Sequence, residues 1–377
     1  MSSITFVAVA ALVGGMCFVV MYMWLQNTRS QNTQFKRQIS SMTSQSKQVT
    51  CANMAALAIP IVYDTNGLPM IDLTVGTPGQ VVRLCLDTGS PDMLIKTPEK
   101  YDPALSTSSV ASDESSCTRV VFGTQSDSVC PITERVLLSG RCVKSSAELK
   151  TEEIAKHLPI GSAEYDKIVL LGSSKRERSE FSPANIPQSD YDVFGLANST
   201  DVAQPALISQ LNAMRSSEGD LSDGTFTFVF GEESGKNVVA HLIIGRLLEV
   251  ETMYHRIAQI PDMDFYRVVL SAMYVGDQRV TSCPNDAIID SGSNYVFAKL
   301  ETVQEITKLA STNRGDMRII LDGFELIVPH AVYSSGGTYY IEETSSPSPT
   351  IVIGTMFLRN VVAEFNAITR TVKMAHL

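Results

Sequence analysis

Short apolar runs separated by turn residues make up most of the chain from Ile59 onward. The stretch at 70–90, MIDLTVGTPGQVVRLCLDTGS, alternates apolar with polar positions and is interrupted by Gly-Thr-Pro-Gly. This pattern predicts a strand, a turn, a second strand and a second turn. Further strands or hairpins are expected over 224–231, 241–245, 265–280 and 360–375.

Helical periodicity is limited to a few stretches. Apolar residues recur at spacings of three and four within 204–214 and 299–311, and Ser145 with Glu148 forms a candidate capping box at the start of 145–158. The predicted fold class is therefore mainly β with a few short helices.

The N-terminal 58 residues differ in composition from the rest of the chain. Residues 4–25 form an uncharged, mostly apolar run that is long enough to cross a bilayer as a helix. No Lys or Arg precedes this run and bulky residues end it, which favours a transmembrane helix or signal anchor over 1–25, with a cleaved signal peptide as the alternative. Residues 26–58 are rich in Ser, Thr and Gln and are interpreted as a polar stalk or a short prosegment.

Composition narrows the function classes. The chain has 377 residues, 44% of them hydrophobic, and a net charge of −10. It is long enough for one large domain or two medium ones. The acidity argues against nucleic acid as a partner, because phosphate binding needs clustered Lys and Arg.

The cysteines and histidines do not form a metal-binding pattern. None of the seven cysteines belongs to a CxxC, and the five histidines are scattered, so we predict no metal site and no cofactor. A disulfide among Cys117, Cys130 and Cys142 fits the spacing, which does not determine its connectivity.

One local pattern occurs twice. LCLDTGS around Asp87 and AIIDSGS around Asp290 each end an apolar strand in Asp, a hydroxyl residue and Gly. Each is followed later by an apolar strand ending in Gly, within DVFGLA at 192–197 and IVIGTMFLR at 351–359. We interpret this as two related lobes, 59–215 and 216–377.

The repeated turns imply a specific chemistry. Two carboxylates at strand ends are costly to bury apart, but together they can share a proton, because like charges in contact cannot both ionise. One carboxyl can then take a proton from a bound water while the other protonates a carbonyl oxygen, which hydrolyses an amide without a metal. The residues expected to support the pair with hydroxyl groups and close backbone approach are Thr88, Gly89, Ser90, Ser291, Gly292 and Ser293.

On these motifs the chain resembles the pepsin-like aspartic proteases from about Ile59 to Leu377. VGTPGQ at 75–80 resembles the family's stretch before its first aspartate, and VVFGTQ at 120–125 falls where the substrate-covering flap is expected. The resemblance implies a bilobal β fold with a central cleft, a catalytic dyad of Asp87 and Asp290, and a hydrogen-bonded grip between Thr88 and Ser291. It also implies a flap at Phe122, Gly123 and Thr124.

Several positions depart from the family pattern. The flap carries Phe122 where the family usually has Tyr, and Leu94 stands where a Trp is common. Thr355 replaces an Asp, and the small disulfide loop after the first motif is missing. These changes bear on specificity and rate more than on the fold.

The favoured function is a membrane-tethered aspartic endopeptidase that cleaves extended peptides or proteins as a monomeric catalytic domain. A protease-like binding protein without turnover is the alternative; a viral-type dimeric protease is disfavoured because it needs one Asp turn per chain. The family's secretory route places the catalytic domain in a lumenal or extracellular space, where Asn198 in NST would accept glycan. The basic residues of the stalk favour the opposite orientation: Arg29, Lys36, Arg37 and Lys47.

Overall fold

The computed structural model describes residues 49–50, 56–112, 114–122, 125–143, 160–178, 191–197, 206–215, 224–231, 233–234, 237–238, 240–244, 255–257, 265–344, 350–369 and 371–376. The predicted membrane segment at 4–25, nearly all of the predicted stalk and the predicted helix at 145–158 lie outside these ranges. Within the described ranges, no helix is both long and apolar enough to cross a membrane.

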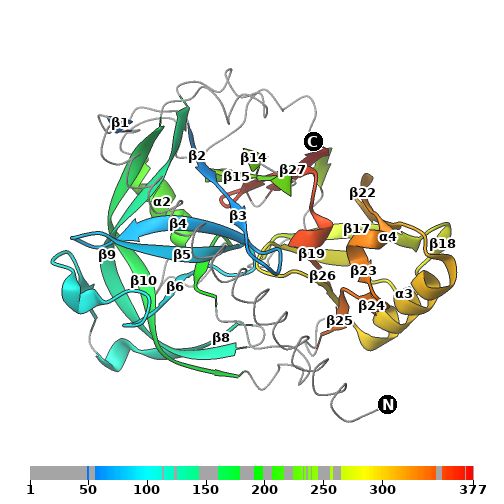
Figure 1. Ribbon diagram of the computed structural model, residues 1–377, viewed down its shortest axis with the longest axis horizontal. Coiled ribbons are helices and arrows are strands. Elements are labelled where there is room, and N and C mark those ends of the chain that lie inside the picture. The colour runs from blue at the N-terminus through cyan, green and yellow to red at the C-terminus, as the bar shows by residue number, and fades with distance from the viewer. Residues whose placement is uncertain are drawn as a thin grey trace, which may run out of the picture. The chain divides into compact units, whose positions relative to one another are not determined.

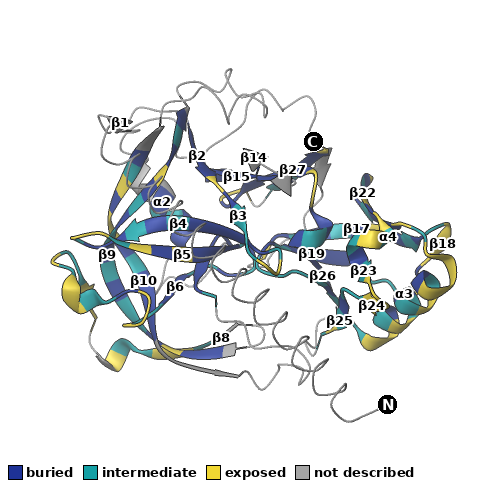
Figure 2. Ribbon diagram, viewed as in Figure 1, coloured by how far each residue is buried: buried dark blue, intermediate teal, exposed yellow. Residues whose placement is uncertain are grey.

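The hairpin predicted over 70–90 is confirmed. Strands β4 (Pro69–Val75) and β5 (Gln80–Asp87) pair antiparallel, from Met70 opposite Cys85 to Val75 opposite Gln80. Along β5 the apolar residues at alternate positions are buried while Val81 and Arg83 between them are exposed. The strand, labelled β5 in Figures 1 and 2, therefore ends in three buried residues followed by Asp87.

The remaining elements of the first half surround this hairpin. The longest are β9 (Gln125–Val143) and β10 (Ile160–Arg178), which pair antiparallel along most of their length. The others are β3 (Val62–Tyr63), β6 (Met93–Lys96), η2 (Pro103–Leu105), β7 (Val110–Ala111), η3 (Glu114–Ser116), β8 (Thr118–Phe122), β11 (Val193–Gly195) and α2 (Leu207–Arg215). Helix α2, predicted at 204–214, is fixed on β10 by Gln210, whose side-chain amide bonds both the N–H and the carbonyl of Val169.

The second half builds its own sheet, shown in yellow to orange in Figure 1. Its strand order is β22-β21-β17-β19-β26-β20-β25, with β18 paired to β17. The bounds are β17 (Arg267–Val275), β18 (Gln278–Arg279), β19 (Asp286–Asp290), β20 (Val296–Ala298), β21 (Met317–Leu321), β22 (Phe324–Val328), β25 (Ile341–Glu343) and β26 (Ile351–Gly354). Short elements complete this half: α4 (His330–Tyr333), β23 (Ser334–Ser335), β24 (Thr338–Tyr339) and η6 (Thr355–Phe357).

Helix α3 (Leu300–Asn313) confirms the prediction at 299–311. Its buried face consists of Thr302, Ile306 and Ala310, which recur at a spacing of four, while most of its other side chains are partly or fully exposed (Figure 2). The helix ends where Arg314 adopts a left-handed conformation with φ of 46°.

A group of strands from both ends of the chain joins the two halves. In order, β2 (Ala56–Pro60), β15 (His241–Ile244), β12 (Thr225–Phe230), β27 (Val361–Asn366), β28 (Thr371–His376) and β16 (His255–Ile257) lie side by side, and β2 also pairs with β9. The boundary predicted after 215 therefore does not separate two independent sheets, and β2 begins at Ala56, within the predicted stalk. Three short strands complete the described residues: β1 (Val49–Thr50), β13 (Glu233–Ser234) and β14 (Asn237–Val238).

An aromatic cluster on these joining strands connects the core to the loops at the strand ends. Phe226 stacks on Phe365 with ring centroids 5.1 Å apart, and Tyr266 packs edge-on against Phe365. The buried Tyr266 hydroxyl donates to the carbonyl of Leu196, 2.9 Å away, and the N–H of Leu196 donates to the carbonyl of Asp87. The first Asp turn is thus hydrogen-bonded to a rigid part of the core.

Candidate active site

The two Asp turns occupy equivalent places in the two halves. Asp87 ends β5 and lies opposite Gly195 on the parallel strand β11, and Asp290 ends β19 opposite Gly354 on the parallel strand β26. These are the two apolar-Gly strands that the sequence analysis associated with the turns. Each Asp is therefore held between its own strand and a neighbour that passes beside its loop.

Reciprocal hydrogen bonds join the two turns. The Thr88 N–H donates to Ser291 Oγ at 3.0 Å, and the Ser291 N–H donates to Thr88 Oγ1 at 2.9 Å. Each hydroxyl in turn donates to a carbonyl of the opposite strand, Thr88 Oγ1 to Ile289 and Ser291 Oγ to Leu86, both at 2.8 Å. Both side chains are completely buried. The hydroxyls predicted to lie beside the carboxylates therefore bond the opposite backbone instead: each donates its proton to a carbonyl and accepts one N–H.

The grip brings the two carboxyl groups into contact. A Cβ added to Gly292 would lie 2.4 Å from Asp87 Oδ1, and one added to Gly89 would lie 2.8 Å from Asp290 Oδ1. Only glycine allows each carboxyl to reach across the opposite turn, as the sequence analysis proposed for these positions. The Asp87 and Asp290 carboxyls therefore lie close enough for each to act on the other's proton equilibrium.

Burial and proximity act on Asp290 in the same direction. Removal from water raises the pKa of the Asp290 carboxyl well above its ordinary value, and the negative charge and hydrogen bond of Asp87 raise it further. The N–H of Gly292, which donates to Asp290 Oδ1 at 2.9 Å, partly offsets this. The raised pKa of Asp290 favours its protonated form in this contact.

The two carboxyls are not equivalent. Asp87 accepts hydrogen bonds from the Gly89 N–H at 2.7 Å and from Ser90 Oγ at 2.5 Å. Ser293, the counterpart of Ser90, donates instead to the carbonyl of Tyr295 at 3.5 Å. The expectation that both serines add a hydroxyl to their own Asp is therefore correct for Ser90 only. The Asp87 carboxyl thus accepts one more side-chain hydroxyl than the Asp290 carboxyl in the described hydrogen bonds.

The positions that depart from the family pattern have local roles. Thr355 is fully buried, and its hydroxyl donates to the Ser291 carbonyl at 2.7 Å, so it supports the second turn without a charge. Leu94 packs in an apolar cluster with Val129, Leu171 and Val193. Cys85 is a buried free thiol, and burial raises its pKa, so it is not a nucleophile. Within the described part of the chain, no three His, Cys, Asp or Glu side chains gather to hold a metal ion.

The segment predicted as the flap forms a hairpin. Strand β8 pairs antiparallel with β9, from Thr118 opposite Val129 to Phe122 opposite Gln125. A disulfide between Cys117 and Cys130 closes the other end of this pairing, which answers the connectivity that spacing left open for these two cysteines. Gly123 and Thr124 lie outside the described residues.

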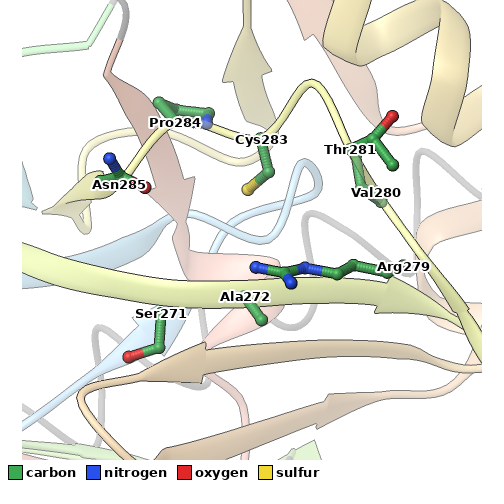
Figure 3. A pocket seen from close by; sticks show the side chains of 8 residues that line it. All are labelled: Ser271, Ala272, Arg279, Val280, Thr281, Cys283, Pro284 and Asn285. Atoms are coloured by element: carbon green, nitrogen blue, oxygen red, sulfur yellow. The ribbon is translucent and has the colours of Figure 1, made fainter.

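Two pockets contain residues that the sequence analysis did not single out. One, of about 550 Å³, includes Tyr63, Tyr295, Tyr340 and Arg359. The other, of about 190 Å³, lies along β17 and contains the half-buried free thiol of Cys283 and the side chain of Arg279 (Figure 3). No repeated motif marks either pocket, because their residues come from segments far apart in the chain or from an ordinary turn.

Comparisons with known proteins agree with this geometry. A family model described as eukaryotic aspartyl protease matches residues 70–322. The crystal structure of the aspartic proteinase from Irpex lacteus matches with a TM-score of 0.63 and 13% sequence identity, covering 85% of this chain and 97% of that one. A search of curated protein sequences finds no match. The structural likeness establishes a shared fold, and the family model covers more than half of the sequence. The chain therefore belongs to the eukaryotic aspartyl protease family.

Proposed function

We propose that the protein is an aspartic endopeptidase that hydrolyses peptide bonds with a water molecule held between Asp87 and Asp290. The observation that carries this proposal is the contact of the two carboxyls, in which Asp290 is held neutral and Asp87 accepts the additional hydrogen bond of Ser90. Family membership supports a protease in general; the assignment of roles rests on this geometry.

The roles follow from the protonation states. Ionised Asp87 takes a proton from the water as its oxygen attacks the carbonyl carbon, and neutral Asp290 donates its proton to the carbonyl oxygen. The tetrahedral intermediate breaks down when Asp87 passes the proton taken from the water to the amide nitrogen and the C–N bond breaks, while Asp290 takes back a proton from a hydroxyl of the intermediate. The amine leaves and both carboxyls return to their starting states. The buried grip of Thr88 and Ser291 keeps the carboxyls in place throughout, so little reorganisation is needed at the reaction step.

A binding protein that has kept the fold without turnover is the second candidate. The observation that favours it is the flap sequence, where Phe122 removes the hydroxyl that a Tyr would offer to a polar network. The dyad geometry favours the enzyme, because a pure binding protein has no need for two buried carboxyls in contact.

The test that separates these candidates is peptide cleavage. The full chain is incubated with a peptide library between pH 3 and pH 7, with and without pepstatin, and products are identified by mass spectrometry. Inhibitor-sensitive cleavage at internal bonds is expected. Peptide binding without any products would favour the binding protein.

Residues 4–25 are proposed to tether the catalytic domain to a membrane, with the domain on the lumenal or extracellular side. The uncharged apolar run supports the anchor, and the secretory route of the family supports the lumenal or extracellular side. The basic residues of the stalk favour the opposite orientation. Release of the full chain by carbonate would contradict the anchor. Asn198, which lies outside the described residues, reports orientation: absence of glycan together with protease access from the cytosol would contradict a lumenal domain.

A further inference from the structure

A pocket of about 550 Å³ is built from both halves of the chain. The first half contributes Tyr63 and the turn at 64–67, and the second half contributes Tyr295, Tyr340, Met356 and Arg359. Tyr295 and Tyr340 stack with ring centroids 5.7 Å apart and an angle of 19° between the rings. The pocket therefore has a rigid aromatic wall suited to the aliphatic part of a side chain.

Two side chains of this pocket can donate hydrogen bonds to a ligand, Tyr63 and Arg359. The Tyr63 hydroxyl is buried and makes no hydrogen bond. Burial also raises its pKa, so it stays protonated and remains a donor at the pH of any assay. The Arg359 guanidinium lies 5.8 Å from the centre of the Tyr63 ring, and none of the described carboxylates forms an ion pair with it.

The nearest carboxylate of the pocket is already occupied. Asp64 accepts hydrogen bonds from the N–H of Asn66 at 2.9 Å, the N–H of Leu68 at 2.8 Å and the side-chain amide of Asn66 at 3.3 Å. These bonds fold Asp64 back onto its own turn. A buried hydroxyl without an acceptor is unfavourable, and the Tyr63 hydroxyl is such a group. Arg359 is exposed and carries a positive charge at the same pocket, so an anionic ligand group would satisfy the hydroxyl and pair with the guanidinium.

Strand pairing in the first half and a hydrogen bond in the second half both connect the pocket to the Asp turns. Strand β3 pairs Val62 with Met70, and Met70 lies opposite Cys85, two residues before Asp87. Two strand spacings place Tyr63 about 10 Å from β5. On the other side, the carbonyl of Tyr295 accepts the Ser293 hydroxyl within the second Asp turn. An extended peptide advances about 3.3 Å per residue, so a side chain in the pocket would belong to a residue about three or four positions from the scissile bond.

We propose that this pocket binds an acidic side chain of the substrate, with Arg359 and the Tyr63 hydroxyl as its recognition groups and the Tyr295–Tyr340 wall packed against its methylene groups. The proposal rests on the proposed function and assigns a substrate class to it: peptides with Glu or Asp three or four residues from the cleaved bond.

The experiment compares peptide pairs that differ only by Glu or Gln at the third or fourth position on either side of the scissile bond, at pH 5.5 with the full chain. We expect Glu to raise kcat/KM about tenfold at one of these positions, as a charge-assisted hydrogen bond does. The change should lie mainly in KM, because the contact is made equally in the bound substrate and the transition state. Equal kcat/KM for Glu and Gln peptides at every position would overturn the proposal.

Three variants test which residues cause the preference for Glu over Gln peptides. Arg359→Gln should reduce the Glu-to-Gln ratio to within about twofold, and Tyr63→Phe should reduce it to about threefold while keeping the fold, since it removes only an unbonded buried hydroxyl. Arg279→Gln is the matched control, because Arg279 is an exposed arginine in the separate pocket of Figure 3, and it should leave the ratio unchanged. A ratio that survives both Arg359→Gln and Tyr63→Phe would also overturn the proposal.

A binding measurement keeps this test independent of turnover. Fluorescence anisotropy with the same Glu and Gln peptides, labelled at one end, gives their Kd values whether or not they are cleaved. If no peptide is cleaved, the proposed function fails, yet tighter binding of the Glu peptide that depends on Arg359 would still support the pocket. Equal Kd values for the two peptides would refute it.

Discussion

Thr88 and Ser291 each use a hydroxyl and a backbone N–H to bond the other's turn, at 2.8 to 3.0 Å, with both residues fully buried. The arrangement is symmetric although one residue is Thr and the other Ser, so the hydroxyl is the shared requirement. The grip fixes the separation of Asp87 and Asp290, because each Asp directly precedes one of these residues.

Removal of the Thr88 hydroxyl should loosen the dyad. Thr88→Val keeps the shape but leaves the Ser291 N–H and the Ile289 carbonyl without partners, at about 1–3 kcal/mol each. We expect the free energy of unfolding to fall by about 2–4 kcal/mol in urea titrations and kcat/KM to fall as well. Thr88→Ser retains the hydroxyl and serves as the control; equal losses in both variants would show that the hydroxyl is not what matters.

Activity should be confined to acidic pH. Asp290 must be protonated to donate to the carbonyl oxygen, and its pKa is raised, so kcat/KM should fall as pH rises through that pKa. A pH–rate profile measures this. A rate that keeps rising toward alkaline pH would be inconsistent with a protonated Asp290.

The same group predicts a pH-dependent stability. Because the folded-state pKa of Asp290 is raised, its contribution to stability is fully present below its unfolded pKa and is lost as pH rises through the folded value. Asp290→Asn mimics the neutral acid, so it should raise Tm relative to wild type at pH 7 but not at pH 3. Asp277→Asn, at an exposed turn, is the control and should change Tm at neither pH. An Asp290→Asn variant less stable than wild type at pH 7 would speak against a neutral Asp290.

Glu305 on α3 should help the fold persist in acid. Burial alone would raise its pKa, but hydrogen bonds from the N–H and hydroxyl groups of Ser282 and Thr281 outweigh this and lower the pKa to about 2. The stabilisation is therefore present above its unfolded pKa and lost as pH falls toward 2. Since the side chain is partly exposed and solvent screens it, we expect Glu305→Gln to cost only about 1 kcal/mol at pH 6, a Tm decrease of about 2 °C, and nothing near pH 2. Glu301→Gln, on the exposed side of α3, is the control. A Tm difference that does not shrink in acid would contradict the lowered pKa.

The flap residue Phe122 should set the rate without being essential. We expect a Phe at this flap position to cover the substrate as Tyr does in the family and to lack only the Tyr hydrogen bond, of about 0.5–1.5 kcal/mol. Phe122→Tyr should therefore raise kcat/KM by up to about tenfold, and Phe122→Ala should lower it sharply. If Phe122→Ala instead lowers only Tm and leaves kcat/KM near wild type, Phe122 is an ordinary strand residue.

Repetition and periodicity made the fold and the dyad predictable from sequence. The β4–β5 hairpin, α3 and the pairing of each Asp turn with its apolar-Gly strand follow from local patterns that tertiary packing reinforces. The joining strands could not be predicted as one sheet, because β2 pairs with β15, which belongs to the second half of the chain. The different hydrogen bonds of Ser90 and Ser293 were also not predictable, since the two motifs are nearly the same in sequence and give no sign that the serines differ.

The pocket around Arg359 could not be predicted from the sequence either. Its donors come from the short strand β3 before the first Asp motif and from a segment after the last apolar-Gly strand. Neither carries a motif, and only the folded chain shows that Asp64 is occupied by its own turn and leaves Arg359 without an ion pair among the described residues.

The measurement that tests the central claim most directly is kcat/KM for Asp87→Asn and Asp290→Asn against a cleavable peptide, with folding checked by circular dichroism. Asp72→Asn, a surface carboxylate paired with Arg83 away from the dyad, is the matched control. We predict that each dyad variant is folded and loses at least about four orders of magnitude in kcat/KM, while the control retains wild-type activity. Substantial turnover by either folded dyad variant would contradict the assignment of Asp87 and Asp290 as the catalytic pair.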